Sequence, residues 1–161
     1  MRSYLAFAAI VLVGLALGKA PAYACMAMAP LELADIKYAD VVVLGRISNY
    51  EIVDGEPGQL GDYARFTVSV DDVLLGQPPQ QLNVVWDNST YAEPESMPSG
   101  SFLIALRDPR SQTPPLRGPS ATVLPNPEPT LLTVLQAPCS DAFIFSSTSD
   151  EARTILKTLR P

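Results

Sequence analysis

Short apolar runs that alternate with polar residues predict a chain built mainly from β-strands. Residues 41–44 are too few for a helix and rich in β-branched side chains, and the chain continues in extended form over residues 46–53. Gly45 separates these two parts, and an isolated glycine within a strand indicates a bulge or a sharp bend. The pattern therefore predicts one long, bent strand.

The next strand shows the clearest alternation of the sequence. Phe66, Val68 and Val70 fall on one face, and the polar residues between them fall on the other. Apolar residues resume at Val73 one position out of step, so a bulge at Asp71-Asp72 is expected to restore the register. Strands that bend and bulge in this way are typical of a small closed barrel.

Later segments predict further strands and a terminal helix. Residues 82–86 alternate, and Trp86 falls on the apolar face of its strand, which predicts a core position. Residues 101–107 predict a further strand, in which Phe102, Ile104 and Leu106 share a face. Residues 131–136 and 142–145 supply more extended chain, and residues 31–38, after Pro30, fit a short helical turn. A capping box at residues 148–151 precedes a single apolar stripe, which predicts a helix over residues 148–160.

These elements predict a mainly β fold: a five-stranded OB-type barrel with a short N-terminal helical turn and a C-terminal α-helix. A β-sandwich is the alternative, but sandwiches usually contain seven or more strands. Residues 108–130 hold seven prolines, too many for a regular element. The chain beyond them is too short to fold alone, so we interpret them as a loop within a single domain of residues 25–161.

The N-terminus reads as a secretory signal over residues 1–24. Arg2 supplies the positive start, an apolar run follows, and Ala22 and Ala24 are the small residues expected before a cut ahead of Cys25. A retained membrane anchor is the alternative, but a run of about 13 apolar residues is shorter than the roughly 20 that span a bilayer. The expected location is periplasmic or extracellular.

Both cysteines remain after this cut. In an exported protein such a pair is expected to form a disulfide, here Cys25–Cys139, which would close almost the whole mature chain. Lipidation of Cys25 is the alternative. A lipoprotein signal normally has an aliphatic residue three positions before the cysteine, where this chain has Ala22.

Charge and composition restrict the chemistry. The chain contains no histidine, which excludes Ser-His-Asp and Cys-His catalysis and any imidazole metal site. Removal of Arg2 and Lys19 takes the net charge from −6 to −8, which disfavours nucleic acid as a partner. No catalytic residue or cofactor is predicted. A membrane partner is expected only if Cys25 is lipidated.

The polar loop that begins at Asp87 carries the one metal site worth testing. Asp87, Glu93 and Glu95 supply the hard oxygens that Ca²⁺ prefers. Their spacing matches no EF-hand, so a solvated loop is the favoured interpretation.

Three segments together resemble a known family. They are ADVVVLGRI at residues 39–47, FTVSVDDVLLG at residues 66–76 and GSFLIAL at residues 100–106, with Cys25 as the first mature residue. This pattern resembles the tissue-inhibitor-of-metalloproteinase and netrin-like module, an OB-type barrel, over roughly residues 25–139. Ala27 stands where the family has its second cysteine.

The resemblance implies a way of acting. In that family the α-amino nitrogen and carbonyl oxygen of the N-terminal cysteine, here Cys25, chelate the catalytic zinc of a protease. The next side chain, here Met26, enters the protease's specificity pocket. We therefore expect an exported, non-enzymatic module that binds a protein partner, an extracytoplasmic metalloprotease being one such partner. An envelope-anchored lipoprotein with a structural role is the alternative.

Overall fold

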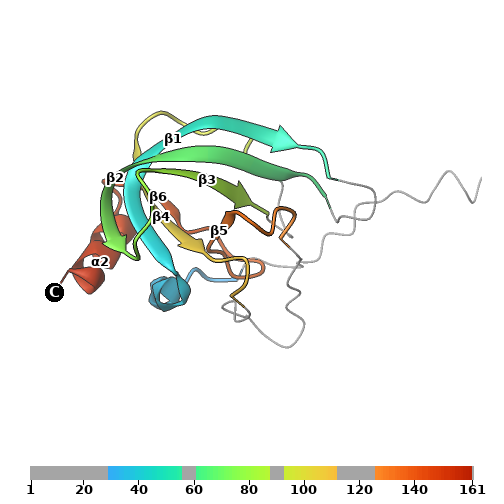
Figure 1. Cartoon of the computed structure of the whole chain (residues 1–161). Helices are drawn as coiled ribbons and strands as arrows, with labels where there is room; N and C mark the ends of the chain where they lie inside the picture. The colour runs from blue at the N-terminus through green and yellow to red at the C-terminus, as the bar shows by residue number, and fades with distance from the viewer. Residues whose placement is uncertain (1–28, 56–60, 88–92, 112–125, 161) are drawn as a thin grey trace, which may run out of the picture.

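Five strands close into a barrel in the computed structural model, which describes residues 29–55, 61–87, 93–111 and 126–160 (Figure 1). The predicted signal and the central part of the proline-rich loop lie outside these residues. Along the chain the elements are the 3₁₀ helix η1 (Leu33–Tyr38), β1 (Val41–Val53), β2 (Tyr63–Leu75), β3 (Gln81–Trp86), β4 (Ser101–Arg107), β5 (Leu132–Val134), β6 (Ile144–Ser146) and α2 (Asp150–Leu159). No helix among the described residues is long and apolar enough to cross a bilayer.

The order of the strands around the barrel is β1-β2-β3-β5-β4, and β4 pairs back with β1 to close it. The β3–β5 pair is parallel, and the other pairs are antiparallel. One edge of β4 pairs with β1, while β5 and the short β6 share its other edge. This closed five-stranded arrangement is OB-like and confirms the predicted fold class.

Gly45 lies where β1 has a partner on each side, opposite Val70 of β2 and Phe102 of β4. A Cβ atom at this position would lie only 2.5 Å from the backbone oxygen of Ser69. The β1–β2 register shifts between Leu44 and Gly45, where Asp71 is the extra residue on β2. The predicted bend and the predicted bulge are therefore one feature, in which β2 presses against a residue that has no side chain.

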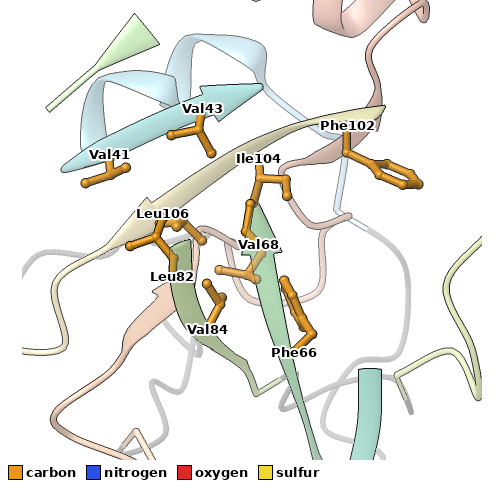
Figure 2. Close-up of a cluster of buried hydrophobic side chains, with 10 residues drawn as sticks. Val41, Val43, Phe66, Val68, Leu82, Val84, Phe102, Ile104 and Leu106 are labelled. Atoms are coloured by element: carbon orange, nitrogen blue, oxygen red, sulfur yellow. The ribbon is translucent and has the colours of Figure 1, made fainter. Parts of the chain in front are cut away.

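Two apolar clusters lie on the two faces of β4. The barrel interior contains Phe66, Val68, Val84, Ile104 and Leu106, together with residues of β1 and β5 (Figure 2). The second cluster lies outside the barrel, where Leu103 and Ala105 of β4 pack against side chains of η1 and α2. Because it is covered on both faces, β4 is buried along nearly its whole length.

The C-terminal helix begins one residue later than the predicted capping box requires. Ser149 is the N-cap, and its hydroxyl accepts the backbone N–H of Ala152 at 3.2 Å. Glu151 is therefore the second residue of the helix instead of the third, and the prediction that Thr148 opens the box is wrong. The apolar stripe is confirmed, because Ala152 and Ile155 are buried against the barrel.

Candidate functional site

The N-terminal segment of the described chain is tied to the turn that carries Cys139. Ala29 donates its backbone N–H to the carbonyl oxygen of Cys139 at 2.7 Å. Cys25 is four positions before Ala29 in the sequence. Cys25 and Met26 lie outside the described residues, so the disulfide and the chelating N-terminus stay predictions. No cysteine in the described ranges is free.

The backbone of Cys139 is unusual. The N–H of Ser140 donates to the carbonyl oxygen of Ala137 at 3.1 Å, which closes a turn with Pro138 and Cys139 at its centre. Cys139 has a φ of 65°, a conformation that glycine or asparagine normally occupies after a proline in such turns. A cysteine held there costs roughly 1 kcal/mol or more, and such strain is concentrated at functional positions.

An apolar pocket of about 630 Å³ opens beside this turn. Its apolar walls come from the N-terminal segment, the end of β3, the β3–β4 loop, β4 and β6: Leu31, Trp86, Met97, Phe102, Ile144 and Phe145. Phe102 belongs to the barrel core, and Trp86, Met97 and Ile144 pack against that core, so the pocket is an opening at one side of the interior. Its volume lies within the range of about 300–1,000 Å³ that ligand pockets occupy.

Hydrogen bonds hold the inner wall of this pocket in place. The indole Nε1–H of Trp86 donates to Gln136 Oε1 at 2.8 Å, and Gln136 Nε2 donates to the carbonyl oxygen of Ser140 at 2.7 Å. The indole was expected in the core. It is half-buried there, and its polar edge is anchored to the β5–β6 loop.

Three polar groups of the pocket make no hydrogen bond or ion pair with the described residues. The Ser140 hydroxyl is buried and has no hydrogen-bond partner among the described residues. Asp141 is exposed at the rim, and Glu151 of α2 is half-buried beside it. No ion pair within the described ranges involves either carboxylate, so the rim carries an uncompensated negative charge.

The three carboxylates considered for Ca²⁺ are not gathered in one place. Glu93 is buried, and its charge adds to burial in raising the pKa of Tyr50 to about 12. Burial raises the pKa of Asp87 to about 6, and Glu95 is exposed. The described residues contain no group of three histidine, cysteine or acidic side chains that could hold a metal ion.

Sequence reasoning identified Trp86 and Cys139 but missed Gln136, Ser140 and Asp141. These three lie in a loop without periodicity, so no sequence pattern marks them. The one local signal is Pro138-Cys139, which predicts a tight turn.

Comparison with protein-family models, with curated proteins and with solved structures gave no match to this chain.

Proposed function

We propose that this chain is an exported, non-enzymatic binding module that contacts a protein partner through the apolar pocket beside Cys139. The observation that carries the proposal is that the N-terminal segment is tied to the Cys139 turn at the edge of a preformed apolar pocket. Energetically dominant contacts between proteins are large side chains that fill such pockets. The negative rim favours a partner whose inserted apolar or aromatic side chain lies next to a lysine or arginine.

The polar side chains that line the pocket favour a binding role over an enzymatic one. Nucleophilic catalysis by serine needs a hydroxyl hydrogen-bonded to a base, and Ser140 has no such partner in the described part of the chain. Gln136 is engaged in fixing the indole and the loop. The pocket therefore offers a shape and hydrogen-bonding groups instead of an activated group.

Site-specific photo-crosslinking tests the contact. A photoreactive side chain is placed at Met97, on the pocket wall, and in a matched variant at Gln77, which is exposed in the β2–β3 turn. We expect a discrete cross-linked protein from the native envelope or medium only with the Met97 probe. Adding Ser140→Trp, which fills the pocket, should remove that product. Equal products from both positions, or a product insensitive to Ser140→Trp, would contradict the proposal.

Inhibition of a zinc protease is a second candidate, and the Ala29–Cys139 hydrogen bond favours it. That bond holds the chain a few residues after Cys25, so a mature N-terminus would start from a fixed base. The test compares protein that begins at Cys25 with protein that carries one alanine ahead of it, on a panel of zinc endopeptidases. The chelate mechanism requires inhibition by the first and loss of inhibition by the second, because the extension moves the α-amino group away.

The state of Cys25 separates this module from an anchored lipoprotein. The intact mass of the exported protein should lie two hydrogens below that of the reduced chain starting at Cys25 if the two cysteines are bonded. Addition of several acyl chains would instead support the lipoprotein alternative. Retention of residues 1–24 would contradict the predicted cleavage.

A further inference from the structure

A second hollow lies on the outer surface of β1, β2 and β3, on a different part of the molecule from the apolar pocket. Its volume is about 450 Å³, and residue Glu128 of the β4–β5 loop borders it. The register of the three strands places polar side chains in rows across the sheet. Thr67 of β2 lies opposite Ser48 of β1 and Asn83 of β3, and Arg65 lies opposite Glu51 of β1. We call this hollow the polar groove.

A bulge in β1 shapes one half of the groove. The β1–β2 register shifts between Ser48 and Glu51, and Asn49 adopts a left-handed backbone with a φ of 52°. The extra residue allows Tyr50 to turn inward, where its ring stacks on Phe66 at 5.9 Å. Asn49 itself remains on the groove side, where its side chain meets Thr67.

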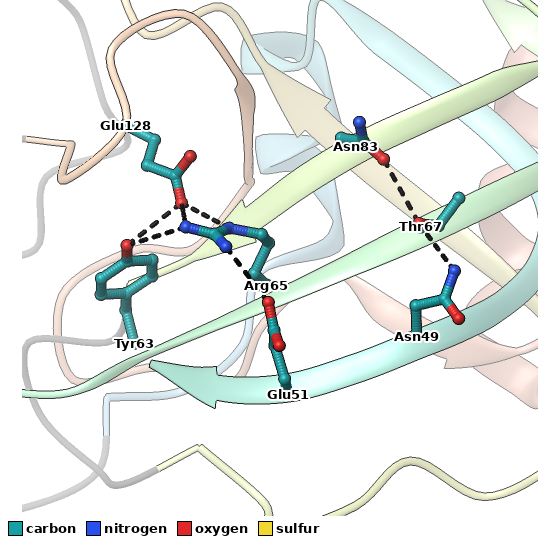
Figure 3. A network of polar contacts seen from close by, with 7 residues as sticks. All are labelled: Asn49, Glu51, Tyr63, Arg65, Thr67, Asn83 and Glu128. Carbon is teal, nitrogen blue, oxygen red and sulfur yellow. Dashed lines mark hydrogen bonds and ion pairs between the residues drawn. The ribbon is translucent and has the colours of Figure 1, made fainter. Parts of the chain in front are cut away.

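Thr67 connects two amides across this half of the groove (Figure 3). Its hydroxyl accepts a hydrogen bond from Asn49 Nδ2 at 3.4 Å and donates one to Asn83 Oδ1 at 3.2 Å. Thr67 is only 7% exposed, so this arrangement is built into the sheet. It leaves the Asn83 amide NH₂ and the Asn49 carbonyl oxygen exposed to a ligand, with no partner among the described residues.

Arg65 holds the side chains in the other half of the polar groove in place through hydrogen bonds. Its Nε–H donates to Glu128 Oε1 at 2.6 Å, and its other nitrogens reach Glu51 at 3.1 Å and the Tyr63 hydroxyl at 3.3 Å (Figure 3). The hydrogen bond with Glu128 raises the pKa of the Arg65 guanidinium. Two carboxylates surround one guanidinium, so the local net charge is −1.

This chemistry selects a class of ligand. The negative local charge and the engaged guanidinium disfavour phosphate and sulfate groups. The charged and amide side chains that line the groove beside Phe66 and Leu131 disfavour a lipid. The face of a sheet offers no free backbone edge to which a peptide strand could add. The groove presents hydrogen-bond donors and acceptors close together. Such an arrangement matches the vicinal hydroxyl groups of a sugar.

We propose that the polar groove binds a neutral oligosaccharide. The Asn83 NH₂ would donate to one hydroxyl group, and Asn49 Oδ1 and the outer carboxylate oxygens of Glu51 and Glu128 would accept from others. In OB-fold proteins the face of the second and third strands with the β1–β2 and β4–β5 loops is a site for oligonucleotides and oligosaccharides, an analogy at the level of fold that agrees in position. Because the groove carries a negative charge, it favours a neutral oligosaccharide over a negatively charged oligonucleotide.

Side-chain resonances of the mature protein test the proposal directly. The probes are cellotetraose, chitotetraose and maltotetraose, with a thymidine tetranucleotide and a sulfated heparin tetrasaccharide as charged comparisons. We expect at least one neutral tetrasaccharide to shift the Asn49 and Asn83 NH₂ signals and the Arg65 Nε–H signal in ¹H–¹⁵N spectra. Asn83→Asp keeps the shape but removes the donor, and it should weaken binding about tenfold, the effect of about 1.4 kcal/mol.

Gln81→Ala is the matched control, because Gln81 is exposed at the other end of β3 and does not line the groove. Its affinity for the sugar should equal that of the wild type. The proposal is overturned if no neutral tetrasaccharide shifts these signals, if Asn83→Asp binds as well as the wild type, or if a charged oligomer binds more tightly. None of these outcomes affects the crosslinking test at Met97, since the two sites share no lining residue.

Discussion

Replacement of Gly45 by alanine should destabilise the barrel, because a single methyl group would separate strands that the closed sheet holds together. The new Cβ would lie 2.5 Å from the Ser69 carbonyl oxygen and 2.9 Å from a Val68 methyl group. The first contact is 0.9 Å inside the 3.4 Å at which ordinary contact begins. Since Gly45 is paired with both β2 and β4, the backbone cannot move away from one strand without disturbing the other.

The cost follows from this geometry. Overpacking of a core by one methyl group costs about 1–3 kcal/mol, and a clash with backbone falls at the upper end of that range. Alanine restricts the unfolded chain and recovers about 0.4–1 kcal/mol. We therefore expect a net loss of about 2 kcal/mol in the free energy of unfolding. For a domain of this size this lowers Tm by about 6–10 °C.

Urea and thermal unfolding of the mature protein, followed by circular dichroism, measure this loss. Ser48→Ala is the control on the same strand, because Ser48 is exposed, and it should change stability by less than about 0.5 kcal/mol. Val68→Ala combined with Gly45→Ala should not restore stability, since the shorter contact is with backbone. A Gly45→Ala protein as stable as the wild type would refute the argument that β2 presses against this position.

Three further predictions test the described interactions. Ser149→Ala should lose about 1 kcal/mol of unfolding free energy in urea, whereas Thr148→Ala should lose clearly less; the reverse order would restore the sequence-based capping box. Asp87 has a pKa of about 6 in the folded protein, above its ordinary value of 3.8, so its charged form opposes folding. Wild-type stability should therefore rise relative to Asp87→Asn as the pH falls from 7 through 6 towards 4 in thermal melts, and a constant difference would contradict this. Burial and the hydrogen bond to Glu128 raise the pKa of Tyr63; Glu128→Gln should lower that pKa in a spectrophotometric titration, and an unchanged pKa would contradict the contact.

The candidate pocket was only partly accessible to prediction. Trp86 could be assigned to the apolar face of its strand because alternation shows which side chains share a face. Its hydrogen bond to Gln136 could not, because the two residues are 50 positions apart and Gln136 lies in a loop without a pattern. The contact between Arg65 and Glu128 in the polar groove could not be predicted either, because these residues are 63 positions apart.

The order of apolar and polar residues along the chain was sufficient to predict where the strands lie. The strand predicted over residues 101–107 matches β4, and the step in register after Val70 located the bulge at Asp71. Such features arise from the two-residue period of a strand and from the small size of glycine, both of which are properties of neighbouring residues.

Tertiary structure decided which strands became neighbours and which hollows remained between them. The parallel β3–β5 pair, the shared edge of β4 and the contact of Ala29 with Cys139 bring together segments far apart in the chain. Pairing of this kind depends on how the whole apolar surface is buried at once, and a local pattern fixes only the face that must be buried. The sequence by itself determined a mainly β chain with a bent first strand, and closure of the barrel created the pocket and the groove.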